Sequence, residues 1–268
     1  MNQYHLRTDA TGRKRLNLQG KVYNPGSQQF ILDQGIKKGW SVLEVGCGSG
    51  TMTKWLAEQV GKQGRVFCID NSRSQVLATQ RLAKKSKLKQ IECQELSVFD
   101  LDNVKEKFDL IYVRFVLIHL DDPYTALVKI KSRLKKGGRL IINDMLNSCS
   151  FCYPKSPIFE QRKQILEQFF IKNGRNPNFS LTLSNMLKKL KLPIITESVF
   201  QPLLSTPAER KLVTLLFYEI KDKLISLNIL TEHEWQVFVN DLKKIQDDKK
   251  YFITLSSMHR ICVGDIIF

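Results

Sequence analysis

The sequence lacks the features of a membrane-spanning or secreted protein. None of its apolar runs is long enough to cross a bilayer, and no apolar core of a secretory signal is found in the opening residues, MNQYHLRTDATGRKR. We therefore expect a cytoplasmic protein without a membrane span. The chain has 268 residues, of which 43% are hydrophobic and 25% charged, so it can bury a sizeable core.

The six cysteines lack the spacing of a metal site or of a disulfide framework. Cys149 and Cys152 form a CxxC pair, but no second pair and no HxxxH supplies the two further ligands that zinc requires. The cysteines at 47, 68 and 93 fall in or beside expected strands, as buried thiols do. We predict reduced cysteines and no bound metal.

No low-complexity linker and no repeat divides the chain. Between residues 41 and 143, short apolar strand patterns alternate with helical patterns, which is typical of βαβ units and a parallel sheet. The expected strands are 41–45, 65–69, 91–96, 109–113, 139–143, 195–203 and 251–261. The expected fold class is α/β, with a doubly wound, mostly parallel seven-stranded sheet.

We interpret the chain as one domain with four parts. These are an N-terminal helical cap (1–36), a ligand-binding core (37–146), a helical insertion after the fifth strand (147–193) and a C-terminal part of the sheet with helices (194–268). Within the cap, Asn24-Pro25-Gly26 predicts a turn. Helices are expected at 158–172, 181–191, 207–226 and 231–246.

The stretch VLEVGCGSGT, residues 42–51, carries the main functional signal. Three glycines at alternate positions, Gly46, Gly48 and Gly50, separate an apolar strand pattern from a helical pattern. Glycine accepts positive φ and lets a ligand approach the backbone, and the N–H groups of the following helix add positive potential. We therefore expect a small polar ligand at this loop.

The spacing of the glycines distinguishes two nucleotide-binding motifs. A dinucleotide fingerprint, GxGxxG, requires glycine at position 51, which is threonine. The motif GxGxG preceded by Glu44 instead resembles Rossmann-like S-adenosylmethionine-dependent methyltransferases. CID, ending at Asp70, and FDLIYVRFVLIHLDDP, residues 108–123, resemble two further motifs of that family. The resemblance covers about residues 23–144. Within the family, the motifs are most similar to those of bacterial small-molecule methyltransferases related to quinone-biosynthesis enzymes.

The resemblance implies S-adenosylmethionine as the cofactor. In the family the glycine loop lies against the methionine part of the cofactor, and the acid after the second strand accepts hydrogen bonds from both ribose hydroxyls. Where the family usually has an aspartate for adenine, this chain has Ser97, so the backbone N–H of Val98 is expected to share that contact. The implied cofactor-binding residues are Glu44, Gly46, Gly48, Gly50, Asp70, Asn71, Ser97, Val98 and Arg114.

Four of the residues singled out also have structural interpretations. Glu44 would otherwise stabilise the fold near backbone amides, and Asp70 would cap the helix that opens with the capping-box pattern of residues 72–75. Arg114 either holds the cofactor carboxylate or pairs structurally. His119 is the candidate catalytic base, because its ordinary pKa suits deprotonation of a hydroxyl or amine, or else a core or cap residue.

Substrate choice is expected in the segments that would cover the site, namely the N-terminal segment and the insertion. Tyr4, Tyr23 and Arg175 lie in these segments and are candidate substrate contacts, with core or surface roles as the alternative. The expected reaction is in-line methyl transfer to a small organic acceptor. The other hypotheses are methylation of RNA or protein and a cofactor-binding module without turnover.

The net charge of +16, from 42 basic and 26 acidic residues, raises the possibility of a nucleic-acid or acidic partner. Most lysine clusters immediately precede an expected strand. In a parallel sheet that edge is opposite the ligand, so we expect a solvated face rather than a substrate track. The run Arg13-Lys14-Arg15 and residues 243–250 are exceptions. The sequence does not indicate an oligomeric state.

Overall fold

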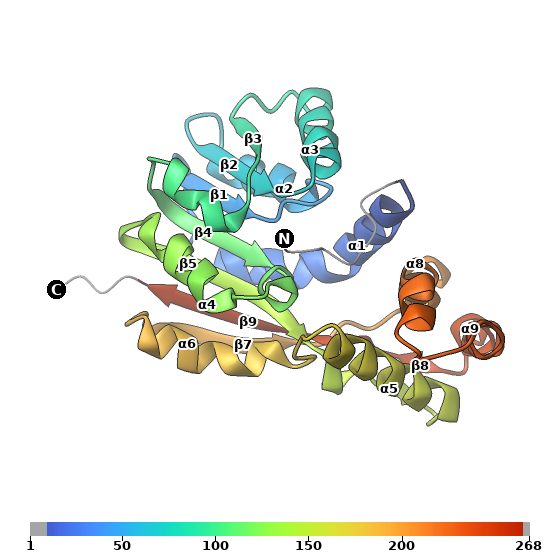
Figure 1. Ribbon diagram of the computed structural model, residues 1–268. Helices are drawn as coiled ribbons and strands as arrows, with labels where there is room; N and C mark the ends of the chain where they lie inside the picture. The colour runs from blue at the N-terminus through green and yellow to red at the C-terminus, as the bar shows by residue number, and fades with distance from the viewer. Residues whose placement is uncertain (1–9, 265–268) are drawn as a thin grey trace.

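The computed structural model describes residues 10–264 and, from residue 12 on, their side chains. At its centre is a seven-stranded sheet of order β3-β2-β1-β4-β5-β9-β7 (Figure 1). The strands are β1 (Ser41–Val45), β2 (Arg65–Asp70), β3 (Ile91–Glu95), β4 (Phe108–Arg114), β5 (Leu134–Leu146), β7 (Ile194–Phe200) and β9 (Ser257–Gly264). β9 runs antiparallel to β5 and β7, and the other neighbours pair in parallel. The predicted fold class is confirmed.

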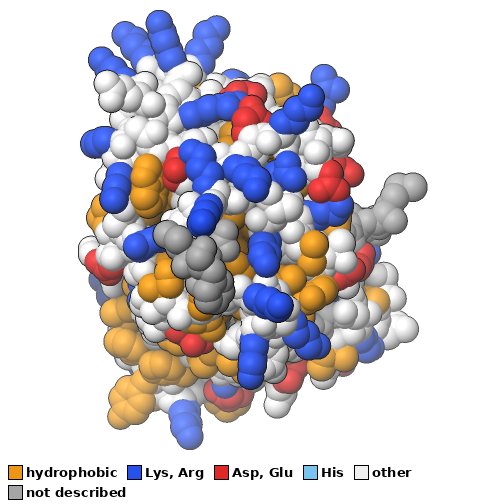
Figure 2. All heavy atoms as spheres, turned by 90° about the vertical axis from the view of Figure 1, so that its left-hand side faces the viewer, with side chains coloured by type: hydrophobic (Ala, Val, Ile, Leu, Met, Phe, Trp, Pro, Cys, Tyr) orange, Lys and Arg blue, Asp and Glu red, His pale blue; other side chains and the backbone are white. Residues whose placement is uncertain are grey.

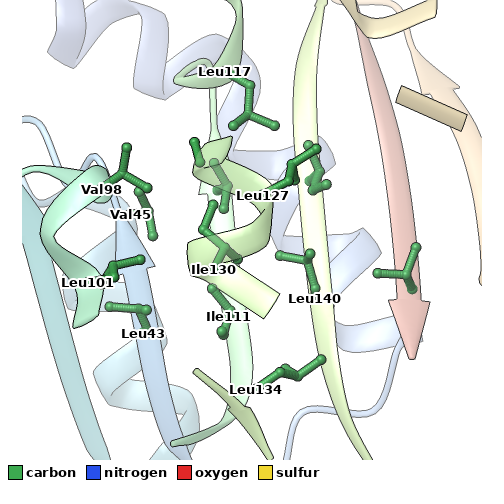
Figure 3. Packing of buried hydrophobic residues seen from close by; sticks show 14 of the residues in the cluster. Leu43, Val45, Val98, Leu101, Ile111, Leu117, Leu127, Ile130, Leu134 and Leu140 are labelled. Atoms are coloured by element: carbon green, nitrogen blue, oxygen red, sulfur yellow. The ribbon is translucent and has the colours of Figure 1, made fainter. Parts of the chain in front are cut away.

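Helices bury both faces of the sheet, as a largely parallel sheet requires. One face packs against α4 (Pro123–Ser132) and α6 (Leu183–Lys189), and the other against α2 (Thr51–Val60) and the end of α1 (Ala10–Asp33). Figure 3 shows Leu127 and Ile130 of α4 over Leu43, Ile111 and Leu140 of the strands. The helices and short 3-10 turns that complete this part are α3 (Arg73–Lys85), η1 (Val98–Asn103), η2 (Leu117–His119), η3 (Asn147–Cys149) and η4 (Phe179–Thr182).

A second group of helices lies beyond the carboxyl ends of β4 and β5 (Figure 1). It has its own apolar core, which includes the fully buried rings of Phe159 and Phe217 and the nearly buried ring of Phe238. Its elements are β6 (Cys152–Tyr153), α5 (Pro157–Lys172), α7 (Pro207–Arg210), α8 (Leu212–Ser226), α9 (Glu232–Asp247) and β8 (Phe252–Ile253). None of the helices between residues 10 and 264 has both the length and the apolar composition needed to cross a bilayer.

The predicted turn at residues 24–26 is wrong, because α1 continues through it as one helix of 24 residues. Contacts with the sheet explain the difference. Asn24 Oδ1 accepts a hydrogen bond from Arg114 Nη1 at 2.8 Å. A Cβ on Gly26 would lie 2.6 Å from the ring of Phe200, so this glycine allows close packing instead of a turn. Tertiary contacts thus outweigh the local Asn-Pro-Gly signal.

Two of the expected strands differ most from the structure in their boundaries. β5 begins at Leu134, directly after α4, because Leu134 pairs with Phe108 ahead of an irregularity in the ladder. The strand expected at 251–261 is divided into β8, which pairs with β6 in a separate two-stranded sheet, and β9, which joins the central sheet; residues 254–256 lie between them. Two of those residues, Leu255 and Ser256, line the cavity described below.

Positive charge gathers on the face where the parallel strands begin. Figure 2 views this side of the molecule and shows lysine and arginine side chains across it. Exposed lysines precede β1, β2, β3, β4 and β7, including Lys37, Lys62, Lys89, Lys107 and Lys191. The predicted position of the lysine clusters, away from the carboxyl ends of the strands, agrees with this arrangement.

Candidate functional site

A cavity of about 250 Å³ lies at the carboxyl ends of β1, β2 and β4, where open α/β sheets bind ligands. One wall is formed by the glycine loop and the strand ends, and the other by α1, α5 and α8. Eight of the nine predicted cofactor-binding residues line the cavity; Gly50 does not. His119, Tyr23 and Arg175 line it too, whereas Tyr4 falls outside the described residues.

The three glycines of the loop have different roles, although all have positive φ. A Cβ on Gly46 would lie 2.4 Å from Val116, and one on Gly50 would lie 2.8 Å from Thr79. These two positions therefore require glycine for packing within the protein. A Cβ on Gly48 would have only Leu16 nearby, at 3.9 Å, so the missing side chain leaves open space in the cavity.

Asp70 anchors this loop with both carboxylate oxygens. The N–H groups of Gly48 and Ser72 each donate to one oxygen, both at 2.9 Å. Burial raises the pKa of Asp70, and the two hydrogen bonds oppose that rise. Because each carboxylate oxygen has a second lone pair, Asp70 can organise the backbone and still accept hydrogen bonds from a ligand.

The predicted capping box at residues 72–75 is wrong. Ser72 is the N-cap of α3 but makes no side-chain cap bond, because its hydroxyl lies 3.1 Å from that of Ser74. Gln75 is instead buried at the cavity, and its Oε1 has no hydrogen-bond partner among residues 10–264. We did not predict Gln75 as a site residue, because its spacing from Ser72 matched a helix cap.

Glu44 is 3% exposed at the end of β1, where it accepts a hydrogen bond from the hydroxyl of Thr53. Burial raises its pKa to about 7, while the Thr53 hydrogen bond and the charge of Arg114 oppose the rise. A cation bound beside Glu44 would favour the ionised form. The residue is therefore both part of the buried structure and a wall of the cavity.

Arg114 ends β4 and connects it to α1. Its Nη1 donates to Asn24 Oδ1 at 2.8 Å and to Ser27 Oγ at 3.3 Å. Within the part of the chain described, no carboxylate forms an ion pair with it. These two hydrogen-bond acceptors of Arg114 are both neutral, and its positive charge at the cavity suits an anionic group of a ligand.

The predicted adenine contacts lie together after β2 and β3. Asn71 is exposed and Val98 is buried, and both line the cavity. Ser97 Oγ already accepts a hydrogen bond from the N–H of Phe99 at 3.2 Å as η1 begins. The apolar side chains of Leu96 and Phe99 complete this corner of the cavity.

His119 lies at the end of η2, and its backbone N–H donates to Val116 O at 3.0 Å. Asp144 holds this turn by accepting a hydrogen bond from the N–H of Ile118 at 3.2 Å. Asp144 is fully buried, and burial raises its pKa to about 7. We did not predict Asp144 as a site residue, although it directly follows the strand expected at 139–143.

The candidate substrate residues have protein partners of their own. The Tyr23 hydroxyl donates to Ser256 O at 2.7 Å, and burial raises its pKa. Arg175 pairs with Asp121 at 2.5 Å. Two further arginines, Arg15 and Arg162, line the helical wall and were not predicted as site residues. The helical spacing of Arg162 from buried Phe159 and Leu166 was the signal that could have found it.

Comparison with known proteins gives a consistent family. A model described as "Methyltransferase domain" matches residues 36–190. An uncharacterized methyltransferase of Schizosaccharomyces pombe is 31% identical over 157 residues, covering 55% of each chain. A demethylmenaquinone methyltransferase of Lactococcus lactis is 30% identical over 132 residues, covering 49% of each. The chain thus spans about half the length of the curated relatives it matches.

Two solved structures are similar in fold. A SAM dependent methyltransferase from Aquifex aeolicus superimposes with a TM-score of 0.51 at 16% identity, and the match covers 89% of each chain. The YcgJ protein of Bacillus subtilis superimposes with a TM-score of 0.58 at 14% identity, covering 90% of this chain and 99% of that one.

Proposed function

We propose, because the chain belongs to the methyltransferase-domain family, that it binds S-adenosylmethionine and transfers the methyl group in line to a small organic acceptor. The observation that carries the proposal is the loop at Gly48. Its missing side chain opens the cavity, and its N–H is held by Asp70, which keeps lone pairs free for a ligand.

The residues present fit this cofactor. Asp70 would accept hydrogen bonds from the ribose hydroxyls, and Arg114, without an acidic partner in residues 10–264, would bind the carboxylate. Glu44 would face the positive charge, and Gln75 Oε1 offers an unused acceptor. Ser97 and Val98 would contact adenine.

The cofactor supplies an electrophilic methyl group when it is bound. The chain then has to align an acceptor with it and keep water out. The wall formed by α1, α5 and α8 would position the acceptor and exclude water. We therefore assign the choice of acceptor to the N-terminal helix and the insertion at 147–193. His119 would take the proton from the acceptor oxygen or nitrogen.

A small acceptor is favoured over a polymer by the arrangement of charge. Most of the exposed lysine clusters precede the parallel strands, on the face shown in Figure 2, whereas the cavity lies at the carboxyl ends of the strands. A nucleic-acid substrate would need a basic track that reaches the site. One relative, moreover, is a demethylmenaquinone methyltransferase.

Calorimetry with S-adenosylmethionine tests the proposal, with Gly48→Val and Gly39→Val as a matched pair. Both glycines have positive φ and an open Cβ direction, but only Gly48 lines the cavity. We expect binding by the wild type and by Gly39→Val, and none by Gly48→Val. Absence of wild-type binding at millimolar cofactor would refute the proposal. Formation of S-adenosylhomocysteine with small-molecule rather than polymer pools would identify the acceptor class.

A further inference from the structure

Arg162 on α5 is a buried charge without a matching acid. It is 3% exposed and lines the cavity, and its Nε donates one long hydrogen bond, 3.3 Å, to Val213 O. Its Nη1 is buried without a partner, and no hydrogen bond of Nη2 is present within residues 10–264. No acidic side chain of the described chain forms an ion pair with it, and the acids that line the cavity, Glu44 and Asp70, belong to the opposite wall.

Two other buried arginines have stronger protein partners than Arg162, although Arg15 Nη2 is also buried without one. Arg210, 7% exposed, donates to four backbone carbonyls at 2.6–2.9 Å. Arg15 pairs with Glu219, a carboxylate whose side chain is 1% exposed. A purely structural role would predict comparable partners for Arg162, since an unpaired buried charge is costly. Besides the long hydrogen bond to Val213 O, the described residues offer Arg162 the rings of Phe159 and Phe217, at 5.5 and 5.6 Å from the guanidinium carbon.

The surroundings of Arg162 indicate which kind of ligand would pair with its charge. Burial lowers its pKa to about 10, which leaves it charged at neutral pH and without compensation. The neighbouring wall is mainly apolar and includes Leu166, Phe169, Leu212, Leu216 and Leu255. A ligand that fits this wall has an apolar body and an anionic group with oxygens for the free guanidinium nitrogens.

We infer that the methyl acceptor is an amphipathic small molecule with an apolar body and a carboxylate, which Arg162 binds. This inference rests on the proposed function, because it names the acceptor class for the same cavity. Arg114 would serve the cofactor carboxylate and Arg162 the acceptor carboxylate, so each cavity arginine without an acidic partner in the described chain would gain one anion.

The test measures carboxylate preference by calorimetry on the full chain saturated with S-adenosylhomocysteine. The probes are 4-hydroxyphenylacetate, indole-3-propionate and octanoate, each compared with its neutral amide. We expect at least one acid to bind about tenfold or more tightly than its amide, as a charged hydrogen bond provides. Arg162→Met should abolish that preference. Arg65→Gln, which removes an arginine from a surface pair with Glu92, should retain it.

Arg162→Lys provides a second test in case Arg162→Met does not fold. It keeps the charge but loses the planar pair of donors, so its acid preference should fall only in part. Equal binding of every acid and amide, or a preference that survives in both Arg162 variants, would overturn the inference. If the wild type does not bind S-adenosylhomocysteine, the proposed function fails, and the acid–amide comparison on the cofactor-free chain still decides the role of Arg162.

Discussion

The two walls of the cavity are built in different ways. In the first, Gly46, Gly48 and Asp70 come from a short stretch of sequence, and hydrogen bonds within the protein hold their backbone. In the second, Arg15, Arg162 and Leu212 come from three distant helices, and the charge of Arg162 has no acidic partner in the described chain. Under the proposed function, the wall for the common cofactor is encoded locally, whereas the wall for the acceptor is assembled by packing.

The largest expected effect is the loss of cofactor affinity when Asp70 of the first wall is replaced. Asp70→Ala removes the acceptor of two backbone N–H groups and the proposed acceptor of the ribose hydroxyls, so we expect cofactor affinity to fall by about 100-fold or more. Asp109→Ala is the control, because it also removes an acceptor of a backbone N–H, that of Ser41, but outside the cavity. Similar affinities of the two variants in calorimetry would contradict the assignment.

A core substitution tests whether the second wall can be lost alone. Phe217→Ala removes a fully buried ring that contacts Phe238 and lies against Arg162, so unfolding free energy should fall by about 3–5 kcal/mol. Tyr218→Ala, at an exposed neighbouring ring, should cost much less. Urea unfolding measures the cost, and cofactor affinity of the folded Phe217→Ala variant should change little. A cofactor loss equal to that of Asp70→Ala would show that the walls are not independent.

The stability of the protein should depend on pH through Glu44, a residue of the first wall. Folding raises the pKa of Glu44 from 4.5 to about 7, so the folded state holds the proton more tightly than the unfolded state. The contribution of Glu44 to the free energy of unfolding is therefore fully present below about pH 4.5 and is lost as the pH rises to 7. The loss is about 3 kcal/mol at most. Asp144, with a pKa also raised to about 7, acts in the same direction.

Glu44→Gln keeps an acceptor for Thr53 and removes this titration. The melting temperature of the variant should fall less between pH 5 and 8 than that of the wild type. Glu44→Gln combined with Asp144→Asn should flatten the profile further. An unchanged slope in both variants would mean that neither acid is protonated in the folded chain near neutral pH.

The smallest effect concerns Arg175, which lines the cavity from the segment after α5. Arg175 already pairs with Asp121, a largely exposed residue, so Arg175→Gln should change stability by less than about 1 kcal/mol. It should also alter acid-over-amide binding less than Arg162→Met does. If Arg175→Gln has the larger effect on acid binding, the two arginines have exchanged roles, and Arg175 is the substrate contact suggested by its segment.

Much of the fold and the family followed from the sequence. The spacing of Gly46, Gly48 and Gly50 after a strand, with Asp70 at the end of the next one, identified the family that the domain match confirms. Alternation of apolar strand and helix patterns located all seven strands, with errors at their ends. These features are predictable because hydrogen bonding and periodicity act over a few neighbouring residues.

One error occurred where distant segments meet. The helix continues through Asn24 and Gly26 because Arg114 and Phe200 contact them from the sheet. Local signals cannot anticipate such partners from elsewhere in the chain. The capping-box error differs, because Asp70, only two residues before Ser72, accepts the cap N–H, and Gln75 lies at the cavity instead of capping the helix.

The sequence alone determined the sheet, the glycine loop and the acid that holds it, because each depends on residues close together in the chain. Only the tertiary structure showed that Gly48 alone of the three glycines opens the cavity and that Arg162 is buried there without an acidic partner in the described chain. Both features depend on which side chains from distant parts of the chain surround the cavity. The packing of α1, α5 and α8 against the sheet decides this, and no local sequence pattern encodes that packing.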